Sequence, residues 1–123
     1  MSNITEYLYR HTTVMHDNVF SLTLRTDGTV VTTTPTRFIL TLTNDSSTIT
    51  MDTDTATYDL GVAGTTENFR FDTATGILTV DIGGDAIATF PAGSYEAELI
   101  WYDASNTNGI VWGPWDKLTV VIE

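Results

Sequence analysis

The sequence contains no cysteine, which excludes both disulfide bonds and thiolate metal sites. Its apolar runs are short, and none reaches the roughly 18 residues that a membrane-spanning helix requires. Basic residues are scarce as well, because 5 Lys and Arg stand against 16 Asp and Glu, a formal net charge of −11. Nucleic acids are bound through clustered Lys and Arg, so neither a nucleic acid nor an anionic membrane is expected as a partner.

Catalytic and metal-binding patterns are also missing from the sequence. His11 and His16 are five residues apart, a spacing that suits neither a helix face nor a strand face. Ser94 lacks the Gly-x-Ser-x-Gly context of a nucleophile elbow, and a strand is expected after it where a helix would be needed. We therefore expect no catalytic residue, no cofactor, no metal ion and no enzymatic activity.

The acidic stretch 52–59 invites comparison with a calcium-binding loop. Asp52, Asp54 and Asp59 supply the carboxylate oxygens that hard cations prefer. The calcium-loop pattern also requires an acidic or amide residue followed by a glycine, and the chain has alanine and threonine at those two positions. A solvated acidic loop is the better interpretation, and a loose cation site in this loop stays open.

Alternation of apolar and polar residues with a period of two predicts an all-β fold. The clearest case places Tyr95, Leu99 and Trp101 on one face of a strand. Glu96 and Glu98 fall on the opposite face. Further strands are expected at 19–25, 37–43, 48–51, 68–72, 77–82, 110–112 and 117–123. About seven to nine short strands with regular turns predict an immunoglobulin-like antiparallel β-sandwich.

A rigid turn introduces the strand that contains Tyr95. Pro91 fixes its own φ, and Gly93 can adopt a positive φ. In Ig-like sandwiches a Tyr near the start of strand F often forms a corner, in which its hydroxyl bonds to backbone a few residues upstream. Pro91, Gly93 and Tyr95 are therefore expected to form a structural corner. The alternative is an ordinary strand tyrosine without that bond.

Residues 1–17 differ from the rest, and we interpret them as an N-terminal arm before an Ig-like domain at 18–123. Asn3 followed by Glu6 is typical of a helix-capping pair, so a short docked helix and an extended arm are both open. The apolar residues of this arm are its candidate interface residues: Tyr7, Leu8, Tyr9, Val14 and Met15. They would either add a strand to a neighbouring subunit or cover an edge of their own sheet.

Large aromatic residues gather around the turn 105–109. Trp101 and Tyr102 precede the turn, and Trp112 and Trp115 follow it. Because adjacent residues of a strand point to opposite faces, at least one of these side chains is expected at the surface. Exposed aromatic side chains anchor protein interfaces. Tyr102, Trp112 and Trp115 are therefore further interface candidates, unless the cluster only closes the end of the sandwich.

Four segments, taken in order, make the chain resemble a known family. They are DNVFSLTLRTDG (17–28), TRFILTLTN (36–44), FRFDTATGILTVDIGGDAIATFPAGSYEAELIWYD (69–103) and GPWDKLTVVIE (113–123). With them the chain resembles the Ig-like domain at the N-terminus of the baseplate upper protein of tailed bacteriophages, and related small tail, neck and capsid-decoration proteins. The likeness covers about 17–123, mostly at core and turn positions, so it is more specific for fold than for function.

The resemblance implies a non-enzymatic structural protein on the outer surface of a virion. Its partners would be capsid, neck or tail subunits, and copies of the chain could also assemble with one another. The acidity suits a place outside the particle, away from packaged DNA. A second hypothesis is a carbohydrate-binding module that touches host glycans with Tyr102, Trp112 and Trp115 as a stacking platform.

Overall fold

The period-two pattern of the sequence is realised as strands that each bury one face. In β10 (Gly93–Tyr102) the side chains of Tyr95 and Leu99 are almost fully buried, whereas Glu96 and Glu98 are exposed. β5, which runs beside β10, alternates in the same way along its length. The elements formed by the described residues are all strands, so the all-β sandwich expected from the sequence is confirmed.

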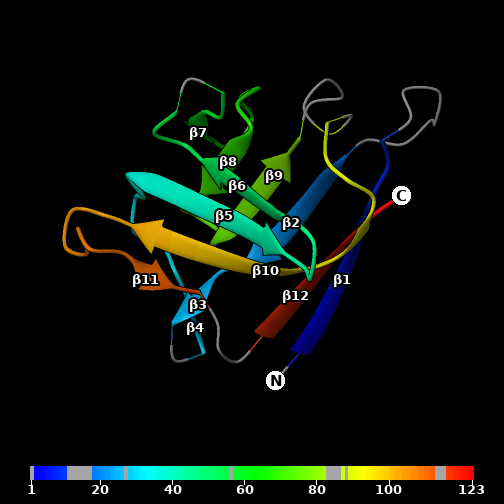
Figure 1. Cartoon of the computed structure of the whole chain (residues 1–123). Helices are drawn as coiled ribbons and strands as arrows, with labels where there is room; N and C mark the ends of the chain where they lie inside the picture. Colours follow the sequence, from blue (N-terminus) through cyan, green and yellow to red (C-terminus); the bar gives the residue numbers. More distant parts are fainter. Residues whose placement is uncertain are drawn as a thin grey trace.

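The strands form two facing sheets and a small ribbon (Figure 1). The computed structural model describes residues 2–10, 18–26, 28–55, 57–82, 87, 89–112 and 116–123. The larger sheet contains, in spatial order, β1 (Ser2–Leu8), β12 (Asp116–Ile122), β10, β5 (Arg37–Thr43) and β6 (Thr48–Asp52), and β11 (Ile110–Val111) also pairs with β10. The smaller sheet contains β2 (Val19–Thr23), β9 (Ile77–Asp81), β8 (Phe69–Asp72) and β7 (Leu60–Val62). The ribbon consists of β3 (Arg25–Thr26) and β4 (Thr29–Val30).

Two strand pairs depart from the antiparallel arrangement that the sequence predicted. β1 is parallel to β12, and β7 is parallel to β8. The antiparallel expectation was therefore wrong for these two pairs. β1 and β12 are the first and last strands of the sequence order, so no hairpin turn joins them. β7 and β8 are separated by residues 63–68, which bring the chain back so that β8 runs in the same direction as β7. None of the described residues belongs to a helix long and apolar enough to cross a bilayer.

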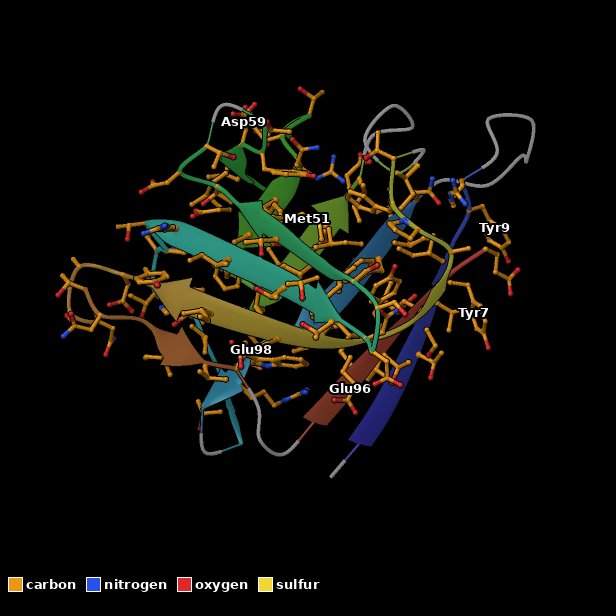
Figure 2. The ribbon with its side chains drawn as sticks, viewed as in Figure 1. Tyr7, Tyr9, Met51, Asp59, Glu96 and Glu98 are labelled. Carbon is orange, nitrogen blue, oxygen red and sulfur yellow. The ribbon has the colours of Figure 1, made fainter. Side chains whose placement is uncertain are left out.

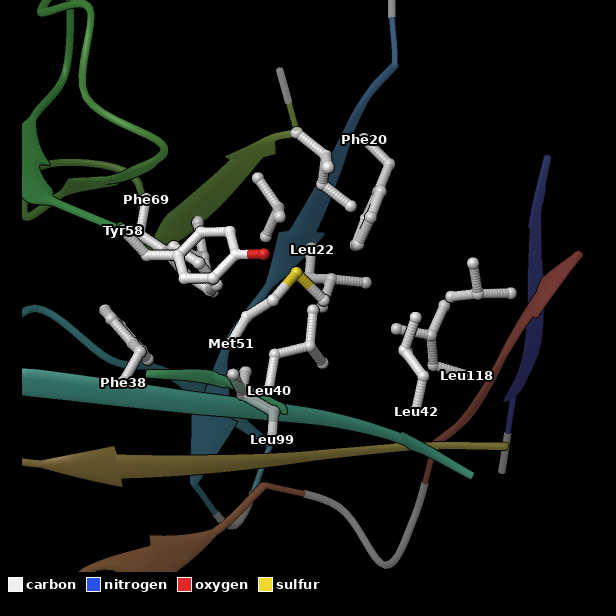
Figure 3. Close-up of a cluster of buried hydrophobic side chains, with 14 of the residues drawn as sticks. Phe20, Leu22, Phe38, Leu40, Leu42, Met51, Tyr58, Phe69, Leu99 and Leu118 are labelled. Atoms are coloured by element: carbon white, nitrogen blue, oxygen red, sulfur yellow. The ribbon is translucent and has the colours of Figure 1, made fainter. Parts of the chain in front are cut away.

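Apolar side chains from both sheets fill the space between them (Figure 3). At one end the Trp101 ring meets Phe38 and Phe71 edge-on, with centroid distances of 5.3 and 5.0 Å. Trp101 and Phe38 belong to the larger sheet and Phe71 to the smaller one, so this cluster joins the two layers. Edge-to-face contacts are a favoured geometry for aromatic rings, and truncating such a ring to alanine costs about 3–5 kcal/mol.

The N-terminal segment belongs to the larger sheet. β1 pairs with β12 along its whole length, so it covers the edge of its own sheet. Ile4 packs against the core, Leu8 is 1% exposed, and Tyr7 is 50% exposed. The helix alternative was wrong, because residues 2–8 form a strand that pairs with β12 along its whole length. The expected arm is corrected accordingly: residues 2–8 are part of the sandwich, and 11–17 lie outside the described residues.

The expected corner bond is present at the start of β10. The Tyr95 hydroxyl donates a hydrogen bond to the carbonyl oxygen of Pro91 at 2.6 Å, and the residue is 1% exposed. Gly93 has a φ of 154°, and a Cβ atom there would approach the Nδ2 atom of Asn44 to 3.1 Å. The tyrosine ring therefore fills the core while its polar end is satisfied by the turn.

Replacing Tyr95 with Phe should lower the free energy of unfolding by about 1 kcal/mol, because one hydrogen bond is lost while the ring stays in place. Urea denaturation followed by tryptophan fluorescence measures the change. Tyr102→Phe is the matched control, since the Tyr102 hydroxyl makes no hydrogen bond to the described residues. A Tyr95→Phe variant as stable as the wild type would show that the corner bond does not stabilise the fold.

Leu8→Ala and Tyr7→Ala test whether β1 is part of the core. Leu8→Ala should destabilise the fold by about 2–5 kcal/mol, as expected for a buried leucine. Tyr7→Ala should stay within about 0.5–1 kcal/mol of wild type, because its side chain is half exposed. Equal, small effects in thermal or urea unfolding would contradict the pairing of β1 with β12 in the same chain.

Candidate interaction face

The outer face of the larger sheet carries an apolar row across three strands. Val111 of β11 pairs with Ile100 of β10, and Ile100 pairs with Ile39 of β5. These side chains point away from the core, because their strand neighbours Trp101 and Phe38 point into it. Val111 is 55% exposed, and the two isoleucines are partly exposed. Cross-strand β-branched residues stabilise the sheet, but here they also leave apolar surface in contact with water.

Tyr102 flanks one side of this row and is held between two neighbours. The Arg37 guanidinium carbon lies 5.1 Å from the centre of the Tyr102 ring, a cation–π geometry. On its other side is Gly109, which has a φ of 86°. A Cβ atom there would come within 2.9 Å of the Tyr102 ring and 2.7 Å of Ile100. Only glycine lets the loop backbone approach this closely, so the ring is fixed in a half-buried position.

Arg37 is already committed to carboxylates of the same face. Its Nε donates to Oδ1 of Asp52 at 2.9 Å and its Nη2 donates to Oδ2 at 2.5 Å, a bidentate pair. Oδ2 of Asp54 lies 3.6 Å from the Arg37 Nε. The hydrogen bonds from Arg37 lower the pKa of Asp52, and the same bonds raise the pKa of Arg37. Asp52 is thus an ion-pair partner of Arg37.

The cation site considered for 52–59 gains no support from this geometry. One of its three carboxylates, Asp52, is occupied by Arg37. Among the described residues, no group of three or more His, Cys, Asp or Glu side chains is placed to hold a metal ion.

The other side of the apolar row is acidic. Glu98 and Glu96 precede Ile100 by two and four residues in β10, and both are exposed (Figure 2). Their cross-strand neighbours on β5 are Thr41 and Thr43, which carry no charge. The face therefore places an apolar strip between an Arg–Tyr pair on one side and carboxylates on the other.

A buried carboxylate organises the loop that follows β10. Asp103 is 6% exposed and accepts a hydrogen bond from the Trp101 indole at 2.8 Å. It also accepts from the backbone N–H groups of Ser105 and Asn106 and from the Asn106 side chain. These hydrogen bonds, the one from Trp101 first, lower the pKa of Asp103. The loop that leads to β11 is thereby tied to the aromatic core.

The smaller sheet has a shallow hollow of about 380 Å³ on its outer face. Arg70 lies in its lining and donates from Nη1 to the backbone oxygen of Thr65 at 3.1 Å. The same nitrogen is 3.6 Å from Asp81, and Asp72 also lines the hollow. The carboxylates outnumber the single guanidinium, so the hollow has no positive charge in excess with which to hold an anion.

The structure separates the interface residues that the sequence predicted. Tyr102 lies on the outer face, but Trp112 is opposite Leu99 and packs against the core. Leu8 is buried and is not available to a partner, so its assignment as an interface residue was wrong. Tyr7 is half exposed, at the β1 edge of the sheet.

The remaining predicted residues are placed as follows. Tyr9 is partly buried, and its backbone N–H and C=O bond to the side chain of Asn18. Val14, Met15 and Trp115 lie outside the described residues. The row of Val111, Ile100 and Ile39 was not singled out from the sequence, although its outward positions follow from the alternation in each strand.

Comparison with protein-family models and with curated protein sequences finds no match for this chain. The interaction face is therefore interpreted from its own residues.

Asp103→Asn should destabilise the fold at neutral pH. It should also make the free energy of unfolding fall less as the pH is lowered. The pKa of Asp103 is lower in the folded chain than in the unfolded chain. The stability that its carboxylate contributes is therefore fully present above the unfolded pKa of about 3.9, and it is lost as the pH falls through the folded pKa. Urea midpoints at about pH 7, 5 and 3 measure the effect. Asp59→Asn is the control, because Asp59 is exposed. If both variants follow the wild-type pH profile, the Asp103 network does not stabilise the loop.

Proposed function

We propose that this chain is a non-enzymatic Ig-like interaction module of a tailed-bacteriophage particle. Other virion proteins would bind to the outer face of its larger sheet. The observation that carries the proposal is the apolar row of Val111, Ile100 and Ile39, because protein interfaces are built around such exposed apolar centres.

The strand order supports the Ig-like assignment. Ig domains place strands B, E and D in one sheet and G, F, C and, in the variable type, C′ in the other. Here the order β2-β9-β8 corresponds to B-E-D, and β12-β10-β5-β6 corresponds to G-F-C-C′. The Tyr95 corner falls at the start of β10, where strand F of an Ig domain has its corner tyrosine.

The resemblance of the sequence to phage Ig-like domains supports the proposal that the chain belongs to a phage particle. The segments that carry it contain β2, β5, β8, β9, β10 and β12, which build the two layers. The net charge of −11 suits an outer position, where the protein does not meet packaged DNA.

A carbohydrate platform is not favoured by the same geometry. Stacking on a sugar requires aromatic faces on one side of the sheet. Tyr102 points outward and is covered by Arg37 and Gly109, whereas Trp112 points inward. These two residues therefore cannot form one platform.

Val111→Arg should reduce incorporation of the protein into particles by about tenfold or more, because a charge is placed in the centre of the proposed interface. Val62→Arg is the matched control, since Val62 is 63% exposed in the smaller sheet. Mass spectrometry of purified particles, from the phage that encodes the chain, measures the number of copies of each variant.

Equal incorporation of the two valine variants would show that the outer face is not the docking surface. Absence of the wild-type protein from purified particles would overturn the virion assignment. Matching circular dichroism spectra and melting temperatures of the two variants establish that both are folded.

A further inference from the structure

The charges around the apolar row indicate what kind of surface it recognises. We infer that the partner presents an apolar centre flanked by Lys or Arg side chains, and that it is not a second copy of this chain. The inference rests on the proposed function, since it names the partner of the same face.

The charges that the structure describes on this face sum to a negative value. Among the outward side chains of the larger sheet that the structure describes, Arg37 is the one cation, and Asp52 and Asp54 already surround it. Glu98 is exposed, and no hydrogen bond or ion pair joins it to the described residues. Because Glu98 is exposed, a partner that covers the apolar row can reach its carboxylate.

The position of Glu98 makes its charge part of the interface. It is two residues from Ile100 on the same face, a separation of about 7 Å along the strand. A partner that covers the apolar row would bring its own rim next to this carboxylate. A basic rim gains attraction there, whereas an acidic rim is repelled.

The same charges disfavour a second copy. In a two-fold symmetric dimer the same patch of each subunit forms the interface, so the described excess of carboxylates over Arg37 would be present on both sides of it. Each copy also carries a formal charge of −11, which adds long-range repulsion. A basic partner is attracted by both the local and the overall charge.

The test uses the full-length chain and the other proteins of the purified particle, each expressed and purified separately. Biolayer interferometry measures their binding to the immobilised chain at about 50 mM and 300 mM NaCl, which shortens the screening length roughly twofold. Glu98→Lys should slow association with the partner by about tenfold at low salt. Glu98→Gln should have a smaller effect in the same direction.

Asp59→Lys is the matched control. It changes the net charge by the same amount, and Asp59 is exposed in the loop before β7, well away from Glu98 (Figure 2). Asp59→Lys should therefore alter association much less than Glu98→Lys. The difference between the two variants separates the local effect of the face from the effect of total charge.

Binding that is lost in Val111→Arg but indifferent to salt and to Glu98→Lys would overturn the basic partner and leave the proposed function in place. Concentration-dependent self-association in light scattering, abolished by Val111→Arg, would show that the face binds a second copy and would likewise overturn the inference. If no particle protein binds the wild-type chain, both the inference and the proposed function fail.

Discussion

The pleat of β10 is the constraint on which both the interior and the candidate interface depend. Successive side chains of a strand point to opposite faces, so this central strand must satisfy two environments at once. Its inward residues, among them Tyr95 and Trp101, link the corner at one end to the aromatic cluster at the other. Its outward residues Ile100 and Glu98 lie in the apolar row and its acidic rim. A shift of one residue in pairing would exchange these two sets and bury the carboxylates.

Much of the sandwich could be predicted because its signals are local. The alternation of β5 and β10, the turn residues and the corner at Pro91 can all be read within about ten consecutive residues. The N-terminal strand could not be predicted in this way. Its capping pair is a local signal for a helix, but β12, more than a hundred residues away, provides the partner that makes it a strand. Tertiary pairing outweighs a weak local preference.

The candidate face shows the same limit more sharply. The sequence indicated that the aromatic residues around the turn 105–109 gather in one region, and it placed Tyr102 outward. It did not reveal that Trp112 is opposite Leu99 and so belongs to the inner face, because that depends on the register of β11 against β10. For the same reason the apolar row, whose members come from three strands, has no signature in any single stretch of sequence. The row becomes visible only when the strands are aligned.

The parallel pairing of β1 with β12 also determines how the molecule would respond to mechanical load. The N-terminus begins β1 and the C-terminus ends β12, and seven residue pairs join these strands between the two ends. Pulling the termini apart slides one strand along the other, so the hydrogen bonds of this pair are loaded together and not one after another. In a force spectrometer the chain should therefore resist extension up to a single high-force event, which unzipping from one end would not produce. Such resistance would suit a component whose two ends are drawn in opposite directions.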